Sequence, residues 1–341
     1  MRITVDIMHP AHLNFFKNSI MQLSEEGHQI DVIVLNRGKL PEIAKREYNS
    51  FSITVMGRHR GNFFSILLEA NILKFFKLLK FVYNKKVDIG LSVGSFILGG
   101  ALKVFGLPNI QFDDDPERKI NVILEKITST KLLFPASVLR GRKIDNFYGL
   151  KEWAYLSPKY FEPKIETLTE LGLREKEYIF VREVDTGSLN YVGQEKNIIA
   201  SVANLLPQNY KYVLSLENKK MLSQYPSNWM VLQEPVSDIH SLMYFSLAVI
   251  SSGDSMAREG AMLGVPSVYC GERVMKANEL LQNKKLLYHI KKNELPKFIN
   301  NLNRTEVLTH QNKIREELLK EWDDINHLIV LLVKEYGKRG N

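Results

Sequence analysis

The strongest constraint on the fold is a regular alternation of short apolar runs with longer segments of helical periodicity along most of the chain. In the first half, the apolar runs predicted as strands are residues 3–8, 30–35, 52–55, 89–93, 109–112 and 131–134. In the second half they are residues 178–181, 212–216, 230–233, 247–250 and 267–269. Helical segments such as residues 13–26 and 119–127 lie between them. Strands that alternate with helices form parallel sheets covered on both faces, so we expect an α/β fold.

Chain length predicts two domains. At 341 residues the chain is too long for one ordinary core and suits two domains of about 150 residues each. We expect a Rossmann-like domain in residues 1–155, a connection in residues 156–170, a second Rossmann-like domain in residues 171–304, and a helical tail in residues 305–341 that packs back on the first domain. Doubly wound sheets bind ligands at the carboxyl ends of their strands. The predicted site is therefore a cleft across which the two tandem domains face each other.

The balance of charge favours anionic partners, because 46 Lys and Arg against 38 Asp and Glu give a net charge of +8. The basic residues form no dense tract, so nucleic acid is not indicated as a partner. Phosphorylated small molecules and anionic membranes remain as candidate partners. The single cysteine, Cys270, excludes an internal disulfide, and no secretory apolar segment follows Met1. Both features are typical of a protein of the reducing cytoplasm.

An apolar and basic stretch, residues 63–83, is long enough to span a bilayer. Polar and charged residues interrupt it, namely Glu69, Asn71, Lys74, Lys77 and Lys80. It is therefore not expected to cross a membrane. Two interpretations remain open. Either the helix packs on the sheet and presents its lysines as a solvated stripe, or it docks peripherally on anionic lipid at the inner face of the membrane.

Residues 251–266, SSGDSMAREGAMLGVP, carry the clearest functional pattern. A glycine-containing turn follows a predicted strand and opens a helix that ends at Gly264 in the left-handed conformation. The free N–H groups at such a helix start suit a diphosphate, and Glu259, one turn further, can accept from two ribose hydroxyls. The alternative is an ordinary capped helix with a solvated Glu259. Asp254 would repel phosphate unless it caps the helix with its charge turned aside.

Two histidines, His9 and His12, follow the first predicted strand. An imidazole can remove a hydroxyl proton or stabilise a departing phosphate, and His9, nearer the strand end, is the predicted base. The alternative is that Pro10 shapes the turn while one histidine caps the following helix. No cysteine or third histidine lies nearby in the sequence, so we predict neither a metal nor another cofactor.

Three aspartates, Asp113, Asp114 and Asp115, end another predicted strand. Their mutual repulsion raises the pKa of one carboxyl, which makes Asp113 or Asp114 a candidate base facing the cleft. The alternative is that Asp114 or Asp115 caps a helix that begins at Pro116.

Further candidates stand at other strand ends. Gly94 and Ser95 end the fourth predicted strand, where a tight turn can approach a ligand. Arg182 ends the first strand of the second domain and can clamp a phosphate, or it forms an interdomain salt bridge. Gly187 and Ser188 follow in the same loop and can add N–H donors.

The segment DIMHPAHLNFFK, residues 6–17, resembles the opening D-I-x-H-P-A-H-x-x-F-F-K of a prokaryotic family of predicted glycosyltransferases catalogued as domain of unknown function 354. Shorter matches follow in order, and they include Gly27-His28, Phe112-Asp113-Asp114, Ala154-Tyr155-Leu156, Leu171-Gly172-Leu173 and Val181-Arg182. Residues 251–266 are similar to the nucleotide-binding segment of glycosyltransferase-B proteins. These include the peptidoglycan lipid-intermediate N-acetylglucosaminyltransferase and the non-hydrolysing UDP-N-acetylglucosamine 2-epimerases.

The resemblance implies a glycosyltransferase-B fold and transfer of a sugar from a nucleoside-diphosphate sugar to a glycan or polyprenyl-linked acceptor in cell-surface polysaccharide synthesis. The residues then expected to bind the nucleotide sugar are Arg182, Gly187, Ser188, Ser252, Gly253, Asp254, Ser255, Met256 and Glu259. Those expected on the acceptor side are Pro10, Gly94 and Ser95, beside the catalytic candidates His9, His12, Asp113 and Asp114.

Two other functions are compatible with this fold. The first is a non-hydrolysing nucleotide-sugar 2-epimerase. Those enzymes resemble one another in an acidic residue and a His-Arg run at places where this chain has Gly94-Ser95-Phe96 and Arg182-Glu183-Val184, so this function is disfavoured. The second is a non-catalytic protein that binds nucleotide sugars, which predicts binding without turnover.

Overall fold

The computed structural model describes residues 1–58, 71–185, 194–233, 236 and 238–337. The chain forms two compact units, one of Met1–Tyr155 with Trp322–Asn341 and the other of Leu156–Glu321. The predicted connection, residues 156–170, thus belongs to the second unit. The predicted tail, residues 305–341, divides between the two units.

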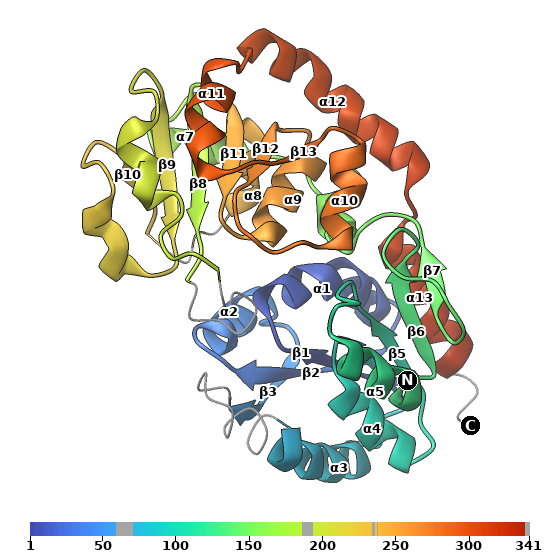
Figure 1. The fold of residues 1–341 in the computed structure, drawn as a ribbon. Helices are drawn as coiled ribbons and strands as arrows, with labels where there is room; N and C mark the ends of the chain where they lie inside the picture. The colour runs from blue at the N-terminus through green and yellow to red at the C-terminus, as the bar shows by residue number, and fades with distance from the viewer. Residues whose placement is uncertain (59–70, 186–193, 234–235, 237, 338–341) are drawn as a thin grey trace. The chain divides into compact units, whose positions relative to one another are not determined.

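A parallel seven-stranded sheet forms the centre of the first unit, in the order β3-β2-β1-β4-β5-β6-β7 (Figure 1). Its strands are β1 (Arg2–Ile7), β2 (Gln29–Asn36), β3 (Ser52–Arg58), β4 (Ile89–Val93), β5 (Asn109–Phe112), β6 (Lys131–Pro135) and β7 (Asp145–Phe147). β1 pairs with β2 on one side and with β4 on the other, so the strand order reverses between β1 and β4. Doubly wound sheets bind their ligands at the carboxyl ends of the strands beside such a reversal.

The helices of the first unit are α1 (Pro10–Glu25), α2 (Leu40–Glu47), α3 (Leu73–Lys85), α4 (Phe96–Val104), α5 (Lys119–Thr128), α6 (Trp153–Leu156) and α13 (Ile325–Gly337). α1 contacts α13, while α3, α4 and α5 follow one another across the sheet (Figure 1). In β1 every residue from Ile3 to Ile7 is buried, which is the pattern of a parallel strand covered on both faces.

The second unit contains a parallel six-stranded sheet in the order β10-β9-β8-β11-β12-β13. Its strands are β8 (Tyr178–Glu183), β9 (Lys211–Leu216), β10 (Met230–Val231), β11 (Ala248–Ser251), β12 (Ser267–Tyr269) and β13 (Leu287–His289). Its α-helices are α7 (Glu166–Thr169), α8 (Ile239–Phe245), α9 (Asp254–Met262), α10 (Lys276–Asn283), α11 (Leu295–Asn300) and α12 (Arg304–Glu321). The 3-10 helices are η3 (Ala200–Leu205), η4 (Lys219–Gln224) and η5 (Lys292–Glu294). Here the strand order reverses between β8 and β11.

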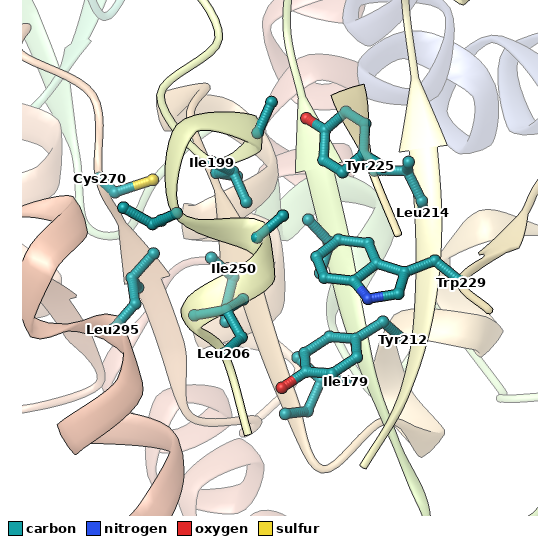
Figure 2. Packing of buried hydrophobic residues seen from close by; sticks show 14 of the residues in the cluster. Ile179, Ile199, Leu206, Tyr212, Leu214, Tyr225, Trp229, Ile250, Cys270 and Leu295 are labelled. Atoms are coloured by element: carbon teal, nitrogen blue, oxygen red, sulfur yellow. The ribbon is translucent and has the colours of Figure 1, made fainter. Parts of the chain in front are cut away.

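A hydrophobic cluster of mostly aliphatic side chains, with three aromatic rings, forms the core on one face of this second sheet (Figure 2). Tyr212 stacks on Trp229 with ring centroids 4.5 Å apart, and the Tyr225 ring lies 5.4 Å from the same indole. Cys270 belongs to this cluster, and burial raises the pKa of its thiol. The chain's only cysteine is therefore a core residue rather than a reactive thiol.

The predicted fold class is confirmed, because each unit has a parallel sheet built from alternating strands and helices. The predicted lysine stripe is wrong in one member: Lys74 is fully buried, whereas Lys77 and Lys80 are exposed. The part of residues 63–83 that precedes residue 71 lies outside the described residues. Within the described chain, no helix has the length and apolarity needed to cross a membrane.

Candidate functional site

His9 lies at the carboxyl end of β1 and is the N-cap residue of α1, where its Nδ1 accepts a hydrogen bond from the Ala11 N–H at 3.2 Å. Pro10 occupies the first helical position, for which proline is well suited. Because Nδ1 accepts, a neutral His9 ring carries its proton on Nε2, which is then a hydrogen-bond donor. His9 is therefore the histidine that caps α1, as the alternative interpretation of the sequence proposed. A role as base through Nε2 requires the ring to give up this cap bond.

His12 lies in the first turn of α1, with its ring centroid 6.0 Å from that of His9. Its Nδ1 faces the Met8 N–H at 3.4 Å. Desolvation by the surrounding protein lowers the pKa of His12 well below its ordinary value, and the charges of His9 and Lys151 add to this effect. His12 is therefore neutral at neutral pH.

The turn after β5 holds three nearly fully buried carboxylates, Asp113, Asp114 and Asp115. Asp113 Oδ1 accepts from the N–H groups of Asp114 at 2.7 Å and Asp115 at 3.1 Å, so this side chain shapes the turn. Arg118 bridges Asp113 Oδ1 at 3.3 Å and Asp115 Oδ2 at 3.0 Å. Lys151 Nζ lies 2.5 Å from Asp114 Oδ1. The acidic turn is thus held by cations, which the sequence pattern did not reveal.

The helix after this turn, α5, begins at Lys119 rather than at Pro116, and its N-cap residue, Arg118, makes no side-chain cap bond. The alternative in which an aspartate caps a helix at Pro116 is therefore wrong. α5 instead buries Glu125 completely beside the acidic turn. Burial and the neighbouring Asp113 charge raise the pKa of Glu125 to about 9, so this carboxyl is protonated at neutral pH.

Gly94 follows β4 and lies beside the acidic turn that follows β5. Its N–H donates to the Phe112 carbonyl at 2.9 Å, and its φ of +60° lies in the left-handed region that favours glycine. A Cβ at this position would lie 3.3 Å from Arg118 Nη2 and 3.9 Å from Asp113 Oδ2. The charges of Asp114 and Arg118 also affect the pKa of His12. The predicted residues of the first unit therefore gather at one sheet edge.

Ser95 is buried one residue further along, and its hydroxyl donates to Asp6 Oδ2 at 2.5 Å. Lys74 Nζ, from α3, donates to both carboxylate oxygens of Asp6 at 2.7 Å, and neither charged side chain is exposed. Asp6 belongs to β1 and Ser95 follows β4. This buried ion pair therefore ties together the two strand ends at the reversal point of the sheet.

In the second unit, the turn after β11 leads directly into α9. Gly253 is the N-cap residue, and it makes no side-chain cap bond. The first N–H groups of a helix have no partners within that helix and form its positive end, which suits an anion. Ser252 anchors the turn, because its Oγ accepts from the Val184 N–H at 3.0 Å. Gly264 has a φ of +76°, which confirms the predicted left-handed helix end.

Asp254, the first residue of α9, is compensated by two arginines. Its Oδ2 lies 3.3 Å from Arg258 Nη1 and 3.7 Å from Arg273 Nη1. Arg258 is buried and also donates to Asn278 Oδ1 at 3.1 Å, so it is held within the fold. The Arg273 side chain retains 22% of its exposure. The carboxylate that would repel a phosphate therefore carries its own counter-charges, and Arg273 is a cation at the site that the sequence analysis missed.

Glu259 is only 6% exposed, so the alternative of a solvated helix residue is wrong. Its Oε2 lies 3.5 Å from Nε2 of His240, at the start of α8. The next residue, Gly260, lets α9 approach the sheet closely, because a Cβ there would lie 2.4 Å from Ser267 Oγ. This close packing fixes the position of Glu259 one turn from the start of α9.

Arg182 is held within the second unit by one residue of β9 and by the residue that directly follows β9. It donates to Ser215 Oγ at 2.6 Å and to Glu217 Oε1 at 2.5 Å. Its observed ion pair is thus made inside one unit, in contrast to the interdomain salt bridge weighed as an alternative. Gly187 and Ser188 lie outside the described residues.

A hollow of about 600 Å³ in the second unit lies away from these groups, and its lining includes Gly264, Val265, Tyr288 and Phe298. Gly264 and Val265 follow the carboxyl end of α9. That end of a helix carries partial negative charge, and three lysines, Lys284, Lys285 and Lys313, also line the hollow. The candidate anion site described above lies at the opposite end of α9, at the carboxyl ends of β8 and β11.

Solved structures resemble this chain over nearly its full length. UDP-GlcNAc 2-epimerase from Neisseria meningitidis, bound to UDP-GlcNAc, has a TM-score of 0.63 at 13% identity, with 98% of this chain and 100% of that chain covered. Glycosyltransferase VinC in complex with DTDP has a TM-score of 0.67 at 12% identity, covering 99% and 100%. MurG from Acinetobacter baumannii has a TM-score of 0.60 at 13% identity, covering 98% and 100%. These likenesses show the fold, which is of the glycosyltransferase-B type.

Sequence comparison identifies the family. The uncharacterized protein MJ0665 of Methanocaldococcus jannaschii is 21% identical over 311 residues, which is 87% of this chain and 89% of that protein. The model of the family described as "Protein of unknown function (DUF354)" matches residues 1–338. With nearly the whole chain matched, the protein belongs to the DUF354 family.

Proposed function

We propose that this protein is a glycosyltransferase that moves a sugar from a nucleoside-diphosphate sugar to a glycan or polyprenyl-linked acceptor in cell-surface polysaccharide synthesis. The observation that carries the proposal is the start of α9. There an N-terminus without a side-chain cap, an aspartate compensated by two arginines, and the buried Glu259 lie within about one helical turn.

This arrangement fits the two polar parts of a nucleoside diphosphate. The N–H groups at the start of α9 and the Arg273 guanidinium can bind the diphosphate, while Glu259 can accept hydrogen bonds from the ribose hydroxyls. Sugar transfer breaks the bond between the anomeric carbon and a phosphate oxygen, so negative charge grows on the diphosphate that leaves. Donors already in place stabilise that charge without a metal ion.

The first unit supplies the groups for the acceptor. Attack by an acceptor hydroxyl requires a base, and the proposed groups are His9, His12, Asp113 and Asp114, with Pro10 and Gly94 beside them. Because the His9 cap bond leaves Nε2–H as a donor, we assign His9 to orienting a substrate oxygen and the acidic turn to accepting the proton.

Nucleotide binding tests the proposal directly. UDP and dTDP are each expected to raise the midpoint of thermal unfolding, since a ligand at 100 times its Kd stabilises the folded state by about 2.7 kcal/mol. Glu259→Gln removes the charge and keeps the volume, and we expect about tenfold weaker binding. The matched control is Glu279→Gln, at an exposed position of α10. If no nucleoside diphosphate shifts the midpoint, or if both variants respond as the wild type does, the nucleotide site is not at α9.

Arg273 permits a finer test of the phosphate end. Arg273→Gln is expected to weaken nucleoside diphosphate binding about 10- to 100-fold, because a hydrogen bond to a charged group contributes about 1.5–3 kcal/mol. Binding of the nucleoside without phosphates should not change, which titration calorimetry can measure. Arg304→Gln, at an exposed ion pair of the same unit, is the control. An equal loss for nucleoside and diphosphate would assign Arg273 a structural role instead.

Turnover assays distinguish a glycosyltransferase from an epimerase and from a non-catalytic binding protein. With a labelled nucleotide sugar and a membrane extract as the source of acceptor, a transferase incorporates label and releases the nucleoside diphosphate. An epimerase would convert UDP-N-acetylglucosamine without any acceptor. A non-catalytic binding protein would give neither product while still binding nucleotide.

A further inference from the structure

Two helices of the first unit bury charge and expose apolar side chains. α5 buries Glu125 yet exposes Ile120 by 74%, together with Ile123 and Ile127 by more than half. These three isoleucines are three and four residues apart, so they form one stripe along the helix. A water-facing helix shows the reverse pattern, with isoleucine inside and glutamate outside. The stripe therefore requires a partner other than water.

α3 shows the same pattern of buried charge and exposed apolar side chains, and α4 also exposes an apolar side chain. α3 buries Lys74 and exposes Phe76 by more than half and Tyr83 by 73%, and Val104, at the end of α4, is also exposed by more than half. α3 contacts α4 and α4 contacts α5, so these side chains belong to neighbouring helices (Figure 1). We name this surface the α3–α5 face and define it by Phe76, Tyr83, Val104, Ile120, Ile123 and Ile127.

Lysines are the exposed charged residues of these three helices. Lys77 and Lys80 of α3, Lys103 of α4 and Lys119 of α5 are exposed. The only acidic residue within the three helices is the buried Glu125. Near the ends of α3 and α4, Tyr83, Lys86 and Phe105 help to line a hollow of about 500 Å³. Apolar side chains interleaved with cations thus cover one continuous set of helices.

Charge decides between the possible partners. In a two-fold dimer through this face, lysines would meet lysines, which is unfavourable. A nucleic acid would pair with the lysines but leave the isoleucine stripe without an apolar partner. An anionic bilayer satisfies both, because apolar side chains enter the interfacial region while lysines bind the lipid phosphates. Tyr83 has the amphipathic ring that suits such an interface.

We propose that the α3–α5 face docks the protein on an anionic lipid surface. Docking does not depend on the nucleotide site, and it places the protein where a polyprenyl-linked acceptor would be found. It rests on the exposed isoleucine stripe and the one-sided charge, and it goes beyond sugar transfer.

Co-sedimentation with vesicles tests the docking face in the full-length protein. We expect binding to vesicles of phosphatidylglycerol and phosphatidylcholine, weaker binding to phosphatidylcholine alone, and release by salt. The variant Ile120→Gln/Ile123→Gln/Ile127→Gln should bind about tenfold or more weakly, as should Lys77→Glu/Lys80→Glu/Lys119→Glu. The control Leu205→Gln/Val274→Gln alters equally exposed apolar residues of the second unit and should bind as the wild type does.

Three results would overturn the proposal: no binding of the wild type to anionic vesicles, equal binding by the isoleucine variant and the control, or a wild-type dimer that the isoleucine variant converts to monomer. Light scattering after gel filtration detects the last. Because all the altered side chains are exposed, the variants should keep the wild-type unfolding midpoint and nucleotide response. Vesicle binding by a protein that binds no nucleotide would refute the transferase and leave the docking face established.

Discussion

Replacing Lys74 with methionine is expected to lower the free energy of unfolding of the first unit by about 3–5 kcal/mol, the usual cost of removing one partner from a buried ion pair. Lys74 Nζ lies 2.7 Å from both carboxylate oxygens of Asp6, and neither side chain is exposed. Methionine keeps most of the apolar volume but leaves the Asp6 charge without its counter-ion. Urea unfolding followed by circular dichroism measures the loss.

The matched controls separate the ion pair from the packing. Lys77→Met changes an exposed lysine of the same helix and should alter the free energy of unfolding by no more than about 0.5 kcal/mol. The double variant Asp6→Asn/Lys74→Met removes both charges and should recover much of the loss, because an amide needs no counter-ion. Equal losses in Lys74→Met and Lys77→Met would contradict this account, as would a double variant no more stable than Lys74→Met.

Lys74 also shows what sequence periodicity cannot predict, namely which lysine of a helix is buried. Apolar runs and helical repeats are local signals, so they predicted the strands of both sheets except β7 and β13, two three-residue strands at the sheet edges. Residues three apart lie about 60° apart around an α-helix, so Lys74 and Lys80 are about 120° apart and cannot share a narrow stripe. Which of the two turns inward depends on Asp6, which is 68 residues from Lys74. Local patterns contain no information about such a partner.

The candidate sites divide in the same way. The Gly253 turn and the helix end at Gly264 could be predicted because they are adjacent in sequence and each has a local chemical reason. Glu259 could be named as a candidate for the same reason. Arg273 could not, because it follows β12 and reaches Asp254 only once the strand order is known. Glu125 had a weak local signal, since it stands in the apolar run VILEKI, residues 122–127, where a glutamate is out of place.

Glu125→Gln is expected to make the protein more stable above neutral pH and to flatten its dependence on pH. The pKa of Glu125 is raised from 4.5 to about 9 by burial and by the Asp113 charge. Between those values the folded state holds a proton that the unfolded state has lost, so the stability of the wild type falls as pH rises, by at most about 1.4 kcal/mol per pH unit. Glutamine stays neutral throughout. Urea unfolding at a series of pH values between about 5 and about 9 measures how the free energy of unfolding of each protein depends on pH.

The two proteins should therefore be similar in stability near the lower end of this window and differ most at its upper end. Glu117→Gln, at an exposed position just before α5, is the matched control and should follow the wild-type slope, because its side chain is exposed rather than buried. Asp113→Asn should reduce the slope in part, since the neighbouring Asp113 charge contributes to the raised pKa of Glu125 after burial itself. Parallel slopes for wild type and Glu125→Gln would show that Glu125 is already ionised in the folded protein. The negative charge of Glu125 would then lie beside the acidic turn, in addition to the three aspartates that pair with Arg118 and Lys151.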